Sequence, residues 1–201
     1  MKNSVTILYL VRHCSYDKSR KILPGRLPVP LSKQGKNEAQ NLRRYFSDKK
    51  IVRIYTSAVL RCQQTAKIMG GGKIPVTYDQ RLLECFSAYQ GYWKVEWRHF
   101  FIHRHELGGE NHQDVQNRMI DFFKKTKFNN DKSYIICSHG DPLYFFYQYL
   151  TKQPLLRENK PNEEQLSPKD YQPTGSIRKI NIYSNGKIEV EALLIQEQLK
   201  N

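Results

Sequence analysis

Two histidines of this chain come directly after strongly apolar stretches. His13 ends the stretch of residues 5–13, in which Arg12 precedes it, and His139 follows the stretch of residues 133–138. Aliphatic and β-branched runs of this length predict strands that are buried on both faces of a sheet. Such strands cannot bury an arginine or a histidine without a partner, so we expect these polar residues at the strand ends. In open α/β proteins that edge of the sheet binds the ligand.

Two further ionisable residues follow other predicted elements. Arg61 lies in the first turns of a helix expected over residues 58–69, and Glu84 follows an edge strand expected at residues 75–78. If the sheet is parallel, both residues share one edge with the two histidines. Guanidinium groups clamp phosphate oxygens, a helix N-terminus adds backbone donors, an imidazole can attack phosphorus, and a carboxyl group can protonate the leaving oxygen. The set therefore predicts a site for a phosphoryl group.

The elements that must position these residues alternate between strand and helix. Strands are expected at residues 5–13, 51–56, 75–78 and 133–138. A helix capped by Ser32 is expected after the first strand, and a helix capped by Ser57 after the second. Further helices are expected over residues 110–128 and 141–150. This alternation predicts an α/β fold, a three-layer sandwich with a mostly parallel central sheet and helices on both faces. We expect a single domain over residues 1–201.

Three segments depart from this alternation. Residues 86–108 are rich in aromatic side chains and are expected to form a small helical insertion over the predicted site. Residues 151–175 are charged and dotted with prolines, which predicts a long surface excursion. Residues 176–195 are expected to form a hairpin, because Asn185-Gly186 between two β-rich runs favours a tight turn.

The composition narrows the range of partners. The net charge is +14 at pH 7, but the basic residues are spread along the chain, which favours a surface suited to small anionic substrates over nucleic-acid binding. No apolar run approaches the length of a membrane span and no signal peptide precedes the first strand, so we expect no membrane contact and a cytoplasmic location. The scattered cysteines predict reduced thiols, and the spacing of His99, His103 and His105 is not that of a zinc hydrolase, so neither metal nor cofactor is expected. The oligomeric state stays open.

Six motifs, in this order along the chain, resemble those of the histidine phosphatase superfamily (phosphoglycerate mutase-like). They are Leu10-Val11-Arg12-His13, Pro30-Leu31-Ser32-Lys33-Gln34-Gly35, Tyr55-Thr56-Ser57-Ala58-Val59-Leu60-Arg61 with Thr65-Ala66, Leu82-Leu83-Glu84, Gly109-Glu110-Asn111 and Cys137-Ser138-His139-Gly140. The resemblance covers about residues 5–150. An Arg-His pair alone would carry little weight, whereas six ordered matches make coincidence a poor explanation.

The resemblance implies a role for each predicted site residue. His13 would be the nucleophile that forms a phosphohistidine, while Arg12, Arg61 and His139 would bind the phosphoryl group and stabilise its charge. Glu84 would be the general acid, and then the base that activates water. His13 must be neutral to attack, which the arginines favour, whereas Glu84 must be protonated, which requires burial to outweigh the same arginines.

The chain departs from the family pattern at Cys14, where a glycine or alanine usually follows the nucleophile. An asparagine that contacts phosphate in many members is also missing from the segment that follows. Lys18 and Ser19 are candidate replacements for it, and Arg26 is a further candidate for substrate binding. Within the aromatic segment the candidates for substrate contact are Tyr89, Trp93 and Trp97.

These observations predict a cofactor-independent phosphatase that hydrolyses a small phosphomonoester through a phosphohistidine on His13. Two alternatives stay open. One is phosphoryl transfer of the phosphoglycerate mutase type. The other is a non-catalytic module that binds an anion or nucleic acid through the same pocket or through the basic surface.

Overall fold

The computed structural model describes residues 4–155 and 170–199 of the chain. In that part, six strands form one sheet in the order β3-β2-β4-β1-β5-β6. The strands are β1 (Val5–Arg12), β2 (Ile51–Thr56), β3 (Val76–Tyr78), β4 (Ser133–Ser138), β5 (Ile177–Tyr183) and β6 (Ile188–Leu194). Strands β1 to β4 pair in parallel, and the antiparallel hairpin β5–β6 adds to the free side of β1. The predicted mostly parallel sheet is confirmed.

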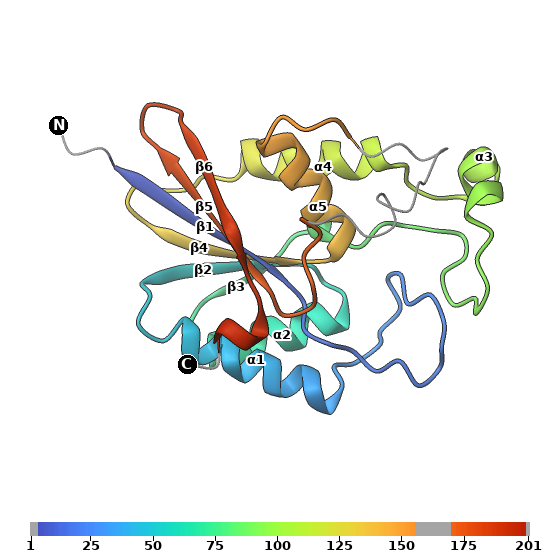
Figure 1. The fold of residues 1–201 in the computed structure, drawn as a ribbon, viewed down its shortest axis with the longest axis horizontal. Helices are drawn as coiled ribbons and strands as arrows, with labels where there is room; N and C mark the ends of the chain where they lie inside the picture. The colour runs from blue at the N-terminus through green and yellow to red at the C-terminus, as the bar shows by residue number, and fades with distance from the viewer. Residues whose placement is uncertain (1–3, 156–169, 200–201) are drawn as a thin grey trace.

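Helices cover both faces of this sheet, as the sequence predicts (Figure 1). They are α1 (Lys33–Tyr45), α2 (Leu60–Gly70), α3 (Trp97–Leu107), α4 (His112–Lys125) and α5 (Gly140–Leu150). Helices α1 and α2 lie on one face, and α4 and α5 lie on the other. No helix among the described residues is both long and apolar enough to cross a membrane.

The central strand β1 is buried on both faces, which explains its unbroken apolar sequence. Tyr9 and Val11 point into a cluster with helices α1 and α2, whereas Leu8 and Leu10 point into the cluster with α4 and α5. This alternation follows from the two-residue period of a strand. Two cores therefore hold the strand that ends at Arg12, and they fix where that strand delivers His13.

The predicted capping of the first two helices is half right. Ser32 caps α1, because its Oγ accepts the backbone N–H of Gly35 at 3.0 Å. Ser57 does not cap α2, which begins three residues later with Val59 at the N-cap position. The Ser57 hydroxyl accepts the N–H of Val59 instead and faces the sheet edge. A serine before a helix is thus an ambiguous signal, since its hydroxyl can serve either the helix or a neighbour.

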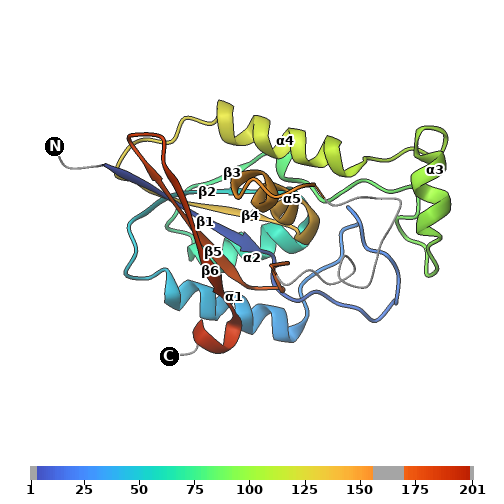
Figure 2. The same cartoon turned by 45° about the horizontal axis from the view of Figure 1, so that its top comes forward.

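The aromatic segment is less helical than the sequence suggests. Only Trp97–Leu107 forms a helix, and residues 86–96 are irregular, with Gly91 at a φ of 90°. Helix α3 stands at the end of the molecule where β1 ends, beside the loop of residues 13–31, in both views (Figures 1 and 2). Backbone hydrogen bonds join Leu23 in that loop to Gly91 and Tyr92 in the insertion. The insertion therefore closes onto the loop that follows His13.

Candidate active site

The structure brings four of the predicted site residues into direct contact around one guanidinium group. The Nε–H of Arg61 donates to Nε2 of His13 at 3.0 Å, and its Nη2 donates to Nδ1 of His139 at 2.9 Å. The same Nη2 lies 3.3 Å from Oε2 of Glu84. Arg61 is completely buried, so water does not screen these interactions, and the low dielectric constant of the interior strengthens them.

Strand register explains why the two histidines meet. Parallel pairing of β1 with β4 places Arg12 opposite Ser138, so that His13 and His139 leave neighbouring strands at the same level. Their ring centroids are 5.2 Å apart. Arg12 turns towards the end of the long excursion, where its Nη1 donates to the carbonyl of Gln172 at 2.7 Å.

The hydrogen bonds of His13 fix its tautomer. Its Nδ1 lies 2.8 Å from the carbonyl oxygen of Cys14, which can only accept, so Nδ1 carries the proton. The lone pair is then on Nε2, where it accepts from Arg61. Burial, and then the charges of Arg61 and Arg12, hold the pKa of His13 well below 6.5. His13 is therefore a neutral imidazole with its nucleophilic nitrogen directed at the guanidinium group of Arg61.

His139 has the complementary arrangement. Its Nδ1 accepts from Arg61, so its proton lies on Nε2, which donates to Oγ of Ser57 at 2.8 Å. The thiol of Cys62 lies 3.4 Å from the same Nε2. Burial, followed by the charges of Arg61 and His13, lowers the pKa of His139 well below 6.5. Ser57, expected only as a helix cap, is thus a residue that orients a site histidine.

The surroundings of Glu84 favour the protonated form of its carboxyl group. Burial raises its pKa to about 7, with a further contribution from the carboxylate of Asp141, against the lowering effect of Arg61 and Arg12. The side chain remains 19% exposed, so it keeps contact with the space from which a substrate would enter. At neutral pH a substantial fraction of Glu84 therefore carries a proton.

The arginines beside His13 retain unused donors. Arg12 Nε and Arg61 Nη1 are buried side-chain atoms with no hydrogen-bond partner among residues 4–155 and 170–199. Leaving a buried charged donor unpaired is costly, so such groups indicate a missing acceptor. An anion with several oxygen atoms, such as a phosphoryl group, would supply it.

The side chains of His13, Glu84 and His139 are close enough to hold a metal ion, since their ligand atoms all lie within 4.8 Å of one another. However, Arg61 already occupies His13 Nε2, His139 Nδ1 and Glu84 Oε2 with its own positive charge. The electrostatics of this arrangement favour an anion over a cation.

Cys14, the residue that departs from the family pattern, is accommodated by the core. Its side chain is fully buried in the cluster that contains Val11 and Cys62, and its N–H donates to Oγ1 of Thr65 at 3.1 Å. Burial raises the pKa of the Cys14 thiol well above its ordinary value, so the group is an uncharged thiol at neutral pH. Cys14 therefore packs as a small apolar residue next to His13.

The loop after Cys14 rests directly on helix α1. A Cβ atom at Gly35 would lie 1.8 Å from the carbonyl oxygen of Ser15, so only glycine allows this approach. Glu38, one turn further along, accepts from the N–H of Ser15 at 2.7 Å and from its hydroxyl at 2.8 Å. The Pro-Leu-Ser-x-x-Gly motif thus holds the backbone next to His13.

Arg26 is used for positioning more than the sequence suggests. Its Nε donates to the carbonyl of Glu84 at 2.8 Å, and its Nη2 forms an ion pair with Glu110 at 2.7 Å. Glu110 also accepts from Arg118 at 2.8 Å and from the N–H of Phe86 at 2.9 Å. In the structure Arg26 therefore fixes the backbone of Glu84, and its expected role in substrate binding stays a prediction.

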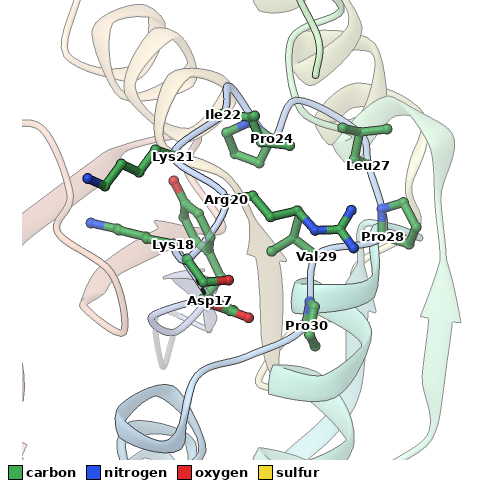
Figure 3. Close-up of a pocket in the computed structure, with 12 residues that line it drawn as sticks. Asp17, Lys18, Arg20, Lys21, Ile22, Pro24, Leu27, Pro28, Val29 and Pro30 are labelled. Carbon is green, nitrogen blue, oxygen red and sulfur yellow. Dashed lines mark hydrogen bonds between the residues drawn. The ribbon is translucent and has the colours of Figure 1, made fainter. Parts of the chain in front are cut away.

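A cavity of about 680 Å³ lies within the loop of residues 16–30 (Figure 3). Its lining includes Lys18 and Ser19, but Lys18 points out of the cavity, whereas Arg20 extends into it. Tyr16 lines this cavity and also lies next to the site, with its ring 5.7 Å from that of His13. Arg20 is thus a basic residue that extends into the cavity, and the expected phosphate contacts of Lys18 and Ser19 stay a prediction.

Tyr89, Trp93 and Trp97, the aromatic candidates for substrate contact, have other surroundings. The ring of Tyr89 packs against Tyr92 and Phe100, and Trp97 stacks on Phe101. Trp93 is 80% exposed. Tyr89 and Trp97 therefore pack within the insertion, and substrate contact by the three rings stays a prediction.

The sequence analysis missed three residues near Glu84 and Arg12. Tyr171 donates from its hydroxyl to Oδ1 of Asp141 at 2.6 Å, and its ring lies 5.2 Å from the guanidinium carbon of Arg12. Gln172 is only 1% exposed, although it belongs to the expected surface excursion. The part of that excursion that returns to the sheet is therefore part of the site, while residues 156–169 lie outside the described chain. Asp141 directly follows the motif Cys137-Ser138-His139-Gly140, and this position is the signal in the sequence that could have identified it.

Comparisons with known proteins agree with this geometry. A relative named "Putative phosphoserine phosphatase 2" from Hydrogenobacter thermophilus is 29% identical over 160 residues, which cover 72% of this chain and 78% of the relative. Two solved structures have the same fold. The YhfR protein of Bacillus stearothermophilus has a TM-score of 0.71 at 24% identity, covering 93% of this chain and 96% of its own. The phosphoglycerate mutase of Bacillus anthracis has a TM-score of 0.75 at 16% identity, covering 98% and 96%.

The family relationship rests on a match that spans most of the chain. The model of the histidine phosphatase superfamily (branch 1) matches residues 8–175, which include both histidines, Arg61, Glu84 and the returning segment with Tyr171. The chain belongs to the histidine phosphatase superfamily.

Proposed function

We propose that this protein is a phosphatase that hydrolyses a small phosphomonoester through a phosphohistidine formed on His13. One observation carries the proposal: buried, unpaired N–H groups of Arg12 and Arg61 lie beside a neutral imidazole whose Nε2 carries a lone pair. Together they supply a nucleophile and the donors that a transferred phosphoryl group requires.

The chemistry divides into two displacements. In the first, His13 Nε2 attacks phosphorus, the bond from phosphorus to the ester oxygen breaks, and Glu84 gives its proton to that oxygen. In the second, water attacks the phosphohistidine, Glu84 takes a proton from the water, and inorganic phosphate leaves as the N–P bond breaks. The raised pKa of Glu84, about 7, supports both roles near neutral pH.

Access to His13 Nε2 requires a change at Arg61. In the structure its Nε–H donates to that nitrogen, so an arriving phosphoryl group has to exchange this hydrogen bond for contacts to its own oxygens. The fixed fork of a guanidinium group suits this exchange, because it can bind two oxygens at once.

The leaving group would occupy the neighbouring cavity. Tyr16 joins it to the site, and its lining combines Arg20 with apolar side chains such as Leu27 and Val29. This combination supports a leaving group with an apolar part and a second polar or anionic group.

A phosphate-release screen of the wild type beside His13→Ala tests the proposal. The panel would contain aryl phosphates, phosphoserine, sugar phosphates and nucleotides. We expect release from at least one class by the wild type, a loss of at least about 1,000-fold in His13→Ala, and an acid-labile phosphoenzyme in the wild type. Equal release by both proteins would reject His13 as the nucleophile. Transfer of the group to a second hydroxyl would indicate a mutase, and salt-sensitive binding of nucleic acid without any release would indicate a binding module.

A further inference from the structure

The acid of the site has a carboxylate neighbour that no motif accounts for. Oxygen atoms of Glu84 and Asp141 lie within 4.8 Å of each other, with the Cys85 thiol as the third member of the group. Two carboxyl groups this close cannot both ionise without a large cost, so the pair prefers to share one proton. Which of the two residues keeps that proton decides which can act as the acid.

Two features of the structure lie beside the carboxyl group of Asp141, a helix N-terminus and a hydroxyl donor. Asp141 lies in the first turn of helix α5, where the helix dipole favours an anion. The hydroxyl of Tyr171 donates to its Oδ1 at 2.6 Å. Burial raises the pKa of this tyrosine far above its ordinary value, so the hydroxyl keeps its proton and acts only as a donor here.

The fold is built to bring Tyr171 to this position. A Cβ atom at residue 140 would lie 2.1 Å from the Tyr171 hydroxyl oxygen, so Gly140 leaves the space that this side chain fills. The next residue, Gln172, is buried and accepts from Arg12. One returning segment therefore fixes both the carboxylate beside Glu84 and the arginine beside His13.

The remaining charges around Glu84 oppose its protonation. Its carboxylate accepts from Arg61 Nη2 and from the N–H of Cys85, and Arg12 acts on it from strand β1. The other ionisable groups that face this region are the neutral histidines His13 and His139, Tyr171, the thiol of Cys85, and the ion pair between Glu110, which precedes helix α4, and Arg118 on that helix. Asp141 is the negative charge among these groups that acts directly against ionisation of Glu84.

We propose that Asp141, held as an anion by Tyr171, is a positioning residue that keeps the shared proton on Glu84, and so makes Glu84 the acid that protonates the leaving group. This inference rests on the proposed phosphatase function. It adds a residue pair, Asp141 and Tyr171, to the reaction and assigns the site to phosphate esters with poor leaving groups, for which a proton donor is essential.

The kinetic test compares Asp141→Asn with the wild type on two substrates. With phenyl phosphate, whose leaving group needs a proton, we expect the basic limb of the kcat/KM profile to move to lower pH by about one unit. With p-nitrophenyl phosphate, which has a good leaving group, we expect little change. Tyr171→Phe keeps the ring against Arg12 but removes the donor, so a smaller shift in the same direction is expected. Asp48→Asn, on an aspartate whose side chain is 78% exposed, is the matched control and should leave the limb in place.

A double-mutant cycle separates this role from a structural one. In the Glu84→Gln background no carboxyl proton remains to be directed, so adding Asp141→Asn should change kcat/KM by less than about twofold. An equal loss in both backgrounds, an equal loss on both substrates, or an unmoved limb would overturn the proposal.

An NMR titration of the Glu84 side-chain carboxyl carbon distinguishes failure of this inference from failure of the proposed function. It requires no turnover, and Asp141→Asn is expected to lower the titration midpoint. A midpoint that stays in place rejects the inference even if the enzyme is an active phosphatase. A midpoint that moves in a protein without phosphatase activity supports the coupling and rejects the assigned reaction.

Discussion

Arg61 connects the parts of the candidate site. Its guanidinium group contacts His13, His139 and Glu84, and its Nη2 also donates to the carbonyl of Gly25 in the loop at 2.8 Å. Since the side chain is fully buried, these neighbours take the place of water around its guanidinium group. No other residue type offers five donors in a fixed plane.

Replacing this arginine by lysine tests how much the fork matters. Arg61→Lys keeps the charge, but an ammonium group cannot reach four partners that were placed for a planar fork. We expect kcat/KM to fall by at least about 100-fold and the free energy of unfolding to fall by about 3–5 kcal/mol, as for other broken buried ion pairs. Steady-state kinetics and urea unfolding measure the two effects. Arg98→Lys, at an exposed position, is the control, and a fully active Arg61→Lys enzyme would contradict the role.

The protonation states predict an asymmetric pH profile. The pKa values of His13 and His139 lie well below 6.5, so neutral His13 persists as the pH falls through 6.5. The pKa of Glu84 is about 7, so its acid form, and with it kcat/KM for phenyl phosphate, is lost as the pH rises above about 7. Glu84→Gln should remove this basic limb. A profile that already declines on acidification through pH 6.5 would show that His13 is not held neutral.

At this scale the sequence predicts the residues but not their connections. Arg12, His13, Arg61, Glu84 and His139 were all identified from strand ends and motifs, because the chemistry requires those residue types. Tyr171, the partner of Asp141, lies 30 residues away in the chain, and Gln172, the partner of Arg12, lies 160 residues away. No local pattern encodes such a contact, so these partners could not be found without the fold.

Helix α1 shows how an element can hold a loop in place. Its glycine at position 35 lets the backbone of Ser15 approach, and Glu38 then fixes that backbone through two hydrogen bonds. The helix therefore contributes to the candidate site through the loop that it holds in place.

A single methyl group should disturb this arrangement. In Gly35→Ala the new Cβ meets backbone that cannot move away by a side-chain rotation, so the loop or the helix has to shift. We expect the free energy of unfolding to fall by about 1–3 kcal/mol, which is typical of overpacking. We also expect kcat to fall by more than the loss of folded protein explains, because the shift displaces the loop next to His13. Urea unfolding and kinetics at saturating substrate measure both effects. Lys36→Ala, at an exposed position of the same helix, is the control, and equal stability of Gly35→Ala and wild type would contradict the contact.

Elements with strong periodic patterns were predicted well and irregular ones were not. The hairpin around Gly186 and the strands β1, β2 and β4 agree with the structure, because burial on fixed faces leaves a readable pattern. The aromatic segment was predicted as more helical than it is, since its rings pack through tertiary contacts that have no period. Gln172, in the excursion of residues 151–175, was expected at the surface, because its contacts also have no period in the sequence.

The whole molecule carries a charge of +14, which should act on any anionic substrate before binding. Raising the salt concentration from about 0.1 to about 1 M shortens the screening length from about 10 to about 3 Å. We therefore expect KM for p-nitrophenyl phosphate to rise several-fold while kcat changes little, because the contacts at Arg61 are buried and poorly screened. Kinetics at constant pH over this range measure the effect. A KM independent of salt would show that the charge does not steer the substrate.

The order of strands has a consequence for how the chain acquires its structure. Strand β1 pairs only with β4 and β5, whose residues 133–138 and 177–183 are synthesised long after it. An emerging chain therefore holds an apolar strand with both edges unpaired until β4 has been made, and with one edge unpaired until the C-terminal hairpin follows. Closing such distant contacts is slow, and exposed strand edges favour aggregation. Strand β1, which leads into His13, therefore carries this risk of aggregation until the hairpin has been made.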